Sequence, residues 1–237
     1  VRNFAEYYFE SGYYKQAIDI YLHLSEEEQT PNPEIFEKLG YAYFKLNQYE
    51  KALSFFKKAE LFDSNRIWNL KQIAFCYQHL KNSEKAMEYF LDAARLDEHN
   101  LTIQKHIAFA YLREGQFEEA LSYFLKIHES IPNNKQIIRS IVWCAFVVGK
   151  IDLAHHHALE MVENDPNPHD LVNYGHIQWV KHDMDDVAKY YKACIKHPDS
   201  SLKQFLTTMH NDKQYLIKNG VNEADIPVIL DYVRYCL

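Results

Sequence analysis

Apolar and small residues gather in paired stretches along the chain, and the pairs recur at a fixed interval. Between the two stretches of each pair lie polar residues and a glycine or asparagine. Six alanines form one column of this pattern: Ala17, Ala52, Ala86, Ala120, Ala154 and Ala188. The first two are 35 residues apart, and each later alanine follows the one before it by 34 residues. A period of this length predicts a repeat architecture, in which each repeat is one supersecondary unit stacked on its neighbours.

Further columns of residues recur at the same interval as the alanines. Twelve residues before the second, third and fourth alanines lies a small residue: Gly40, Ala74 or Ala108. Nine residues before them lies Tyr43, Tyr77 or Tyr111, and four residues after the first four alanines lies Tyr21, Phe56, Phe90 or Phe124. Small residues allow two helices to approach closely, and aromatic rings fill the space beside them. The columns therefore predict interlocked helix pairs.

A third kind of column falls between the two stretches of each repeat. Its members are Gly12, Asn47, Lys81, Gly115, Gly149 and Asp183. Glycine and asparagine suit a left-handed residue that ends a helix. Each repeat is therefore predicted to be a helix, a tight turn and a second helix.

The pattern resembles the tetratricopeptide repeat family, whose signature is W-x2-L-G-x2-Y, then A-x3-F, then P. The second repeat matches best, through Phe36, Leu39, Gly40, Tyr43, Ala52 and Phe56. The resemblance extends over residues 33 to 134 and weakens afterwards. In the sixth repeat His176 and Trp179 take the small and Tyr places, Lys192 takes the Phe place, and only Ala188 is retained. Terminal repeats are expected to diverge in this way.

The resemblance implies an all-α fold, a right-handed α-solenoid of about six tetratricopeptide-like helix-turn-helix repeats. The repeats are expected at about 1–32, 33–66, 67–100, 101–134, 135–168 and 169–199. Two amphipathic helices, at 200–219 and 222–237, are expected to form a C-terminal cap over the last repeat.

The resemblance also implies that the first helices line a concave groove in which partner peptides lie. Three residues before the small column, these helices present Glu37, Lys71, Lys105, Arg139 and Asn173. One residue after it they present Tyr41, Phe75, Phe109, Trp143 and Ile177. Equivalent residues on stacked helices lie about 10 Å apart, so these columns form a largely cationic ladder and an aromatic ladder. Trp68, His79 and Arg113 are expected to border them.

The charge of the groove would contrast with that of the whole chain, which is −7 at pH 7. A cationic stripe in an acidic protein favours a peptide that carries acidic residues together with an aromatic or aliphatic anchor. An alternative stays open at this point. The aromatic residues would then only pack between neighbouring helices, and the lysine and arginine stems would cover them while their charges stay in water.

Catalytic and metal-binding chemistry finds no support in the sequence. No phosphate-loop, dinucleotide, zinc-protease or nucleophile-elbow motif occurs, so no enzyme and no cofactor are predicted. The run His155-His156-His157 directs its side chains about 100° apart on a helix, which prevents them from converging on one metal. The thirteen histidines show no metal-ligand spacing. No metal site is predicted.

Composition limits the partners and the compartment. A pI of about 6.0 disfavours nucleic acid, and no apolar run approaches the ~20 residues of a membrane span. Cys76, Cys144, Cys194 and Cys236 lack metal spacing and are expected to be buried reduced thiols, which favours a cytoplasmic location. Residue 1 is Val, so a processed or truncated chain is expected, and the missing signal segment carries little weight.

Two functions remain. The preferred one is a non-catalytic scaffold or adaptor that binds a peptide or helix of another protein in the groove. The alternative is a structural module, either a homo-oligomer or the C-terminal part of a larger protein, whose contacts run through its ends instead of the groove.

Overall fold

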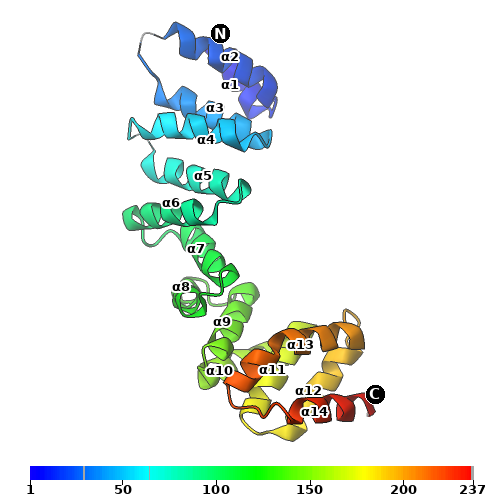
Figure 1. Cartoon of the computed structure of the whole chain (residues 1–237). Helices are drawn as coiled ribbons and strands as arrows, with labels where there is room; N and C mark the ends of the chain where they lie inside the picture. The colour runs from blue at the N-terminus through cyan, green and yellow to red at the C-terminus, as the bar shows by residue number, and fades with distance from the viewer. Residues whose placement is uncertain (29, 64, 236–237) are drawn as a thin grey trace. The chain divides into compact units, whose positions relative to one another are not determined.

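The computed structural model describes residues 1–28, 30–63 and 65–235, and over these residues every regular element is a helix (Figure 1). The elements are α1 (Arg2–Glu10), α2 (Tyr14–Glu27), α3 (Pro33–Lys45), α4 (Tyr49–Glu60), α5 (Arg66–His79), α6 (Ser83–Leu96), α7 (Leu101–Arg113), α8 (Phe117–Ser130), α9 (Lys135–Val147), α10 (Ile151–Glu163), α11 (Pro168–Val180), α12 (Met184–Lys196), α13 (Leu202–Lys218) and α14 (Asp225–Tyr235).

The helices form two compact units, Val1–Ala110 and Tyr111–Leu237, divided within α7. Within each unit, consecutive helices pack as pairs, such as α3 with α4 and α11 with α12. The odd-numbered helices from α1 to α11 are the first helices of the repeats, and the even-numbered helices from α2 to α12 are the second. The predicted all-α, tetratricopeptide-like solenoid of helix pairs is confirmed.

The turn inside each repeat is set by one left-handed residue. Gly12, Asn47, Lys81, Gly115 and Gly149 have φ values of 78°, 59°, 58°, 73° and 82°, as the turn column predicts. The prediction for Asp183 is wrong. His182 is the left-handed residue there, with φ 65°, whereas Asp183 has φ −91° and caps α12 by accepting a hydrogen bond from the backbone N–H of Asp186.

The cause is a change in the length of one helix. α10 has 13 residues and α8 has 14, so the sixth repeat follows the fifth after 33 residues. The small, alanine and aromatic columns of the sixth repeat are therefore occupied by Gly175, Val187 and Tyr191. A Cβ built on Gly175 would lie 2.5 Å from the Tyr191 ring, just as one on Gly40 would lie 2.7 Å from Phe56. In this register the sixth repeat keeps the small and aromatic residues of the family pattern, whereas Gln178 and Val187 stand in its Tyr and Ala places.

This register corrects four predicted positions. Val187 and Tyr191 are fully buried, as the alanine and aromatic columns require. The assignments of those columns to Ala188 and Lys192 are wrong, and so are the assignments of the small and Tyr places to His176 and Trp179.

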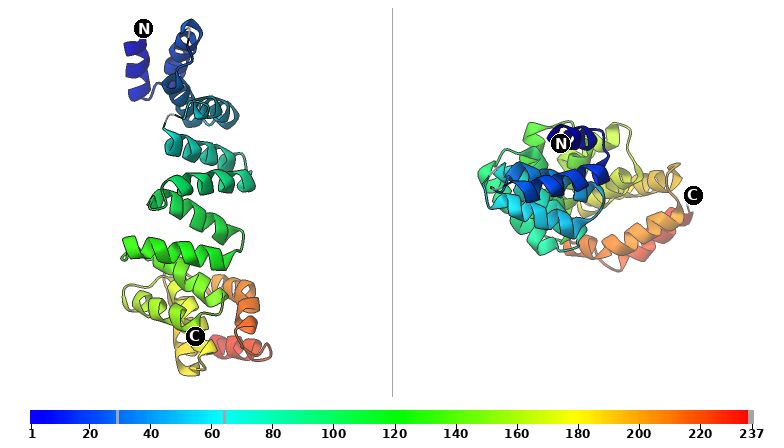
Figure 2. Two further views of the ribbon diagram at one scale, coloured as in Figure 1. Left: turned by 90° about the vertical axis from the view of Figure 1, so that its left-hand side faces the viewer. Right: turned by 90° about the horizontal axis from the view of Figure 1, so that it is seen from above.

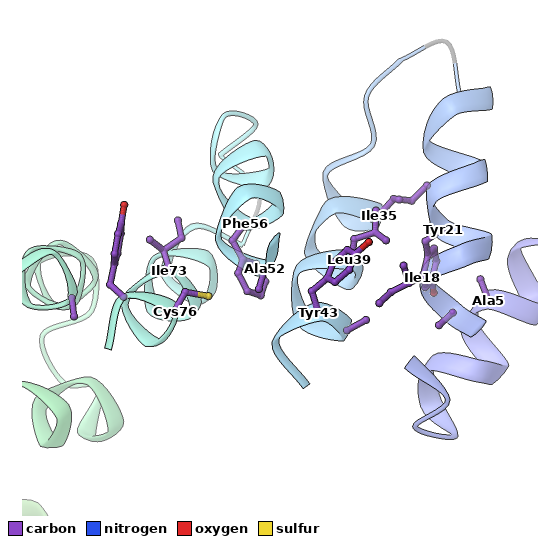
Figure 3. Close-up of a cluster of buried hydrophobic side chains, with 14 residues drawn as sticks. Ala5, Ile18, Tyr21, Ile35, Leu39, Tyr43, Ala52, Phe56, Ile73 and Cys76 are labelled. Carbon is purple, nitrogen blue, oxygen red and sulfur yellow. The ribbon is translucent and has the colours of Figure 1, made fainter. Parts of the chain in front are cut away.

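The core of unit 1 runs continuously from one helix to the next (Figure 3). Tyr21 of α2 lies beside Ile35 and Leu39 of α3, and Phe56 of α4 fills the space between α3 and Ile73 of α5. The Phe56 ring sits where Gly40 leaves room, which is the close packing expected of protein interiors. The repeat columns of the sequence are therefore the core itself.

Cysteine burial agrees with the prediction where it can be compared. Cys76, Cys144 and Cys194 are buried free thiols, and Cys236 lies outside the described residues. Among the described helices, none is long and apolar enough to cross a membrane.

Candidate functional site

An aromatic pocket opens on the first-helix face of unit 1, the surface formed by α1, α3 and α5. Its volume is about 320 Å³, and it is lined by Phe9, Glu34, Glu37, Lys38, Tyr41 and Trp68. The Tyr41 ring lies 5.6 Å from the Phe9 ring and 6.5 Å from the Trp68 ring, centroid to centroid. Trp68 is held edge-on against the buried Phe56 at 5.6 Å. Three separate helices therefore supply the walls.

The charged side chains on one side of this pocket neutralise one another. Lys38 pairs with Glu6 and lies 3.7 Å from Glu34, and Arg2 lies 2.6 Å from Glu34. Burial raises the pKa of Glu6, but the hydrogen bonds from Lys38 and Tyr21, together with the charges of Lys38 and Arg2, hold that pKa below its usual range. On the other side, the Lys45 ammonium lies 5.1 Å from the centre of the Tyr41 ring.

Two members of the charged column are paired, one in each unit. Glu37 is buried and accepts hydrogen bonds from the side-chain amides of Asn65 at 2.8 Å and Asn69 at 3.1 Å. Arg139, in unit 2, donates from Nε and Nη2 to the two carboxylate oxygens of Asp170, each at 2.8 Å. Both residues therefore connect their own first helix to the first helix of the following repeat.

Lys71 and Lys105 differ from these two. Both are half-buried, and neither has an ion-pair partner among the residues that the structure describes. For Lys71, the reason lies in the following repeat. Asn69 and Asp170 stand five residues before their small column, and the same column holds Ile103 in the repeat after Lys71. An isoleucine offers no group that could pair with an ammonium.

Other predicted residues of the aromatic ladder are engaged in packing. The half-buried Phe75 ring lies 5.4 Å from Phe90 and 4.7 Å from His106. The exposed His79 ring stacks flat on Tyr49 at 4.3 Å. Phe109 is half-buried in α7, and Arg113 is exposed at the end of that helix, in unit 2. Tyr41 and Trp68 are half-buried as well, and they line the pocket described above.

In unit 2 the ladder is rearranged. The Trp143 ring is covered by Tyr215 of α13, edge to face at 5.4 Å. The placement of Asn173 and Ile177 in the ladders is wrong by one residue, because the sixth repeat begins one residue early. Val172 and His176, both buried, occupy those columns instead.

Sequence reasoning missed Phe9, Glu34 and Lys38. The small column, extended to the first repeat, is the signal that finds Phe9; Glu34 and Lys38 belong to the second repeat and carry no such signal. Ala5, twelve residues before Ala17, is fully buried and marks α1 as a first helix.

Two family models, both described as tetratricopeptide repeat, match residues 33–66 and 72–100. No curated protein matches the sequence.

Several solved structures share the fold. YrrB, a TPR protein with an unusual peptide-binding site, is 19% identical with a TM-score of 0.68, over 80% of this chain and 97% of that one. The C-terminal part of a TPR repeat-containing protein from Cytophaga hutchinsonii is 15% identical with a TM-score of 0.65, over 92% and 84%. A tetratricopeptide repeat protein from Parabacteroides merdae is 17% identical with a TM-score of 0.51, over 98% and 82%.

At identities this low, the solved structures show a shared fold and no more. The two family models identify residues 33–66 and 72–100 as tetratricopeptide repeats. Repeats of this kind generally serve as protein-interaction modules. The chain is a tetratricopeptide repeat protein.

Proposed function

We propose that the chain is a non-catalytic adaptor that holds a segment of a partner protein against the first-helix face of unit 1. The observation that carries this proposal is the aromatic pocket of Phe9, Tyr41 and Trp68, with Lys71 one helical turn beyond Trp68 and without an ion-pair partner among the described residues. Rings presented on rigid helices are typical anchors of recognition, because little side-chain entropy is lost when they bind. The repeat fold itself is typically non-catalytic.

The partner segment carries one bulky aromatic or aliphatic side chain with Asp or Glu nearby. A pocket of about 320 Å³ is of the size that accepts one such side chain. Lys71 and Lys105 supply half-buried ammonium groups that no described carboxylate neutralises, so a carboxylate of the partner would form charge-assisted hydrogen bonds there. The peptide-binding site named for YrrB supports the proposal only by likeness of fold.

The test is a binding experiment with charge reversal at Lys71 and Lys105. The purified chain and its Lys71→Glu/Lys105→Glu variant are used as baits in lysate from the source organism. Proteins retained only by the unaltered chain are then mapped to a binding segment, and its affinity is measured by calorimetry. We expect the double reversal to weaken binding by about 100-fold, since each close charge pair contributes more than 1 kcal/mol.

The matched control reverses two exposed lysines on second helices, Lys15→Glu/Lys196→Glu, which keeps the net charge equal to that of the test variant. A Trp68→Ala variant tests the pocket separately, and we expect it to cost at least tenfold in affinity. Equal retention by all four baits would contradict the proposal.

Self-association is a second candidate, favoured by one observation on α1. Phe4 and Tyr7 are 66% and 62% exposed, whereas Leu39 and Ala42, their equivalents in the second repeat, are fully buried. An exposed apolar surface of this kind is typical of contact sites. Light scattering over a range of concentrations tests it: a concentration-dependent mass that disappears in Phe4→Glu/Tyr7→Glu supports this function, and a constant monomer mass rejects it.

A further inference from the structure

Helix α13 lies across the first-helix face of unit 2 (Figures 1 and 2). Phe205, Met209 and Leu216 are 2%, 1% and 0% exposed, and Asp212 between them is 8% exposed. These residues follow the i, i+4, i+7, i+11 spacing of one helical stripe. α13 thus presents an amphipathic face to the repeats, with an acidic residue inside its apolar stripe.

The receiving face offers a specific partner for that acidic residue. His176, fully buried on α11, lies with Nε2 3.2 Å from the Asp212 carboxylate and with Nδ1 2.6 Å from the Tyr191 hydroxyl. One consistent arrangement has the tyrosine hydroxyl donating to Nδ1 and Nε2–H donating to Asp212. His176 stands in the column that holds Tyr41 in the second repeat. In unit 2 the ladder position is therefore used to bind a helix.

The far end of α13 makes directed contacts with α9. Asn219 Nδ2 donates to the carbonyl of Phe146 at 2.8 Å, and Lys218 Nζ donates to the carbonyl of Val147 at 3.0 Å. Carbonyls in the last turn of a helix lack partners within that helix. The C-terminal end of α13 and its cap residue therefore supply donors to carbonyls in the last turn of α9. Tyr215 covers Trp143 between these contacts and His176.

These contacts define the shape of the occupant. Asp212, Tyr215 and Asn219 are three and four residues apart and all reach the same face. Only a helix places residues at this spacing on one side, because an extended segment sends alternate side chains to opposite sides.

We propose that the first-helix face of unit 2 is a helix-binding surface, that α13 fills it in cis, and that it fits in trans an amphipathic helix of the same pattern. That pattern is large apolar residues at i, i+4 and i+11, an acidic residue at i+7 and an aromatic residue at i+10. The inference does not depend on peptide binding by unit 1, which uses other residues.

Release of α13 is a condition of binding in trans. A segment tethered to its site has an effective concentration of about 1 mM or more. A free helix at micromolar concentration therefore does not displace the intact α13, and it binds only where the tethered copy has been weakened.

The test uses the full chain and a synthetic, end-capped, fluorescent peptide of residues 201–220. The chain carries Asp212→Ala/Tyr215→Ala, which weakens α13 and leaves the receiving residues intact, while the peptide keeps the native sequence. We expect the peptide to bind this variant at least tenfold more tightly than the unaltered chain, measured by anisotropy. A peptide with the same two alanines is the matched control and should bind weakly to both proteins.

Hydrogen exchange and circular dichroism make the result interpretable. The amides of 202–218 should exchange faster in the variant while α9 and α11 stay protected. A folded variant with exchanging α13 amides that fails to bind the native peptide would overturn the proposal, and so would unchanged protection of α13. If this variant does not fold, Lys218→Ala/Asn219→Ala removes only the contacts to the α9 carbonyls and is used with the same peptide. Added Trp143→Ala should abolish binding, and persistent binding would place the peptide elsewhere.

Discussion

Arg139 and Asp170 form a two-point ion pair that ties the first helix of one repeat to the first helix of the following repeat. The Asp170 side chain is 2% exposed, and one of its oxygens also accepts the backbone N–H of Asn167, which caps α11. In unit 1, Glu37 and Asn69 stand in the same two columns and are joined by a hydrogen bond. One position in the repeat thus serves as a polar connection wherever the next repeat supplies a partner.

Removal of Arg139 should therefore lower stability. Arg139→Ala leaves the buried Asp170 carboxylate without its cation, and we expect the free energy of unfolding to fall by about 3 kcal/mol, the low end for a buried pair because Arg139 is 32% exposed. Urea unfolding followed by circular dichroism measures it. Lys105→Ala is the control, since Lys105 occupies the same column without a described partner, and it should stay within about 0.5 kcal/mol of the unaltered protein. Equal losses from both substitutions would contradict this account.

The two glycines of the small column should respond differently to alanine. In Gly175→Ala the new methyl meets the Tyr191 ring, whose hydroxyl is held by His176 and whose centre lies 5.1 Å from that of the Phe205 ring. We expect a loss of about 1 to 3 kcal/mol from overpacking. Gly40→Ala meets Phe56, a ring with no polar anchor, and alanine already fills this column as Ala74 and Ala108.

Alanine has a higher helix propensity than glycine by about 1 kcal/mol. This gain should leave the stability of Gly40→Ala close to that of the unaltered protein. Thermal unfolding of both variants gives the comparison. A larger loss for Gly40→Ala than for Gly175→Ala would refute the role given to the hydroxyl of Tyr191.

Acidification should weaken the packing of α8 against α10. Burial, and then the neighbouring His128 and His156, lower the pKa of His157 below 6.5, and its ring lies 5.1 Å from that of His128. The unfolded chain then binds more protons than the folded chain near and below pH 6.5. The contribution of neutral, buried His157 to the free energy of unfolding is therefore fully present above pH 6.5, and it is lost as the pH falls through the pKa of His157 in the folded protein.

Unfolding of the protein and of His157→Gln at pH 7.5 and pH 5.5 tests this. The variant should lose less stability on acidification than the unaltered chain. Identical losses would show that His157 does not carry the effect.

Buried thiols should resist alkylation in the folded protein. Burial raises the pKa values of Cys76 and Cys144 to about 12 and also raises that of Cys194. Because the thiolate is the reactive form, iodoacetamide at pH 8 should modify these three slowly in buffer and rapidly in urea. Peptide mapping by mass spectrometry resolves each site, and rapid modification of Cys76 or Cys144 without denaturant would be inconsistent with their burial.

The helix pairs could be predicted from the sequence because packing imposes the repeat directly. Ala52 and Phe56 recur as Ala86 and Phe90 since each second helix must fill the same space beside a small residue. The turn residues could also be predicted from the local sequence, because only a few residue types tolerate a positive φ. Burial of three cysteines could be predicted for the same reason, as they lie within apolar stretches.

The candidate site was less accessible to sequence reasoning because it depends on pairs of residues. Lys71, Lys105 and Arg139 look alike in one column, and only the residue that follows in the next repeat separates them. The covering of Trp143 by Tyr215 depends on the path of α13, which no periodicity encodes. The binding roles of Tyr41, Trp68, Lys71 and Lys105 stay predictions.

The shorter α10 also has a consequence for exchanging modules between repeat proteins. Donor and acceptor cut at fixed 34-residue intervals would be joined out of phase at this point, with every side chain after the joint turned by about 100° around its helix. Cuts placed at the left-handed residues, Gly149 and His182, would give a module of 33 residues that keeps its own register. Such a module would preserve the fit of Tyr191 over Gly175.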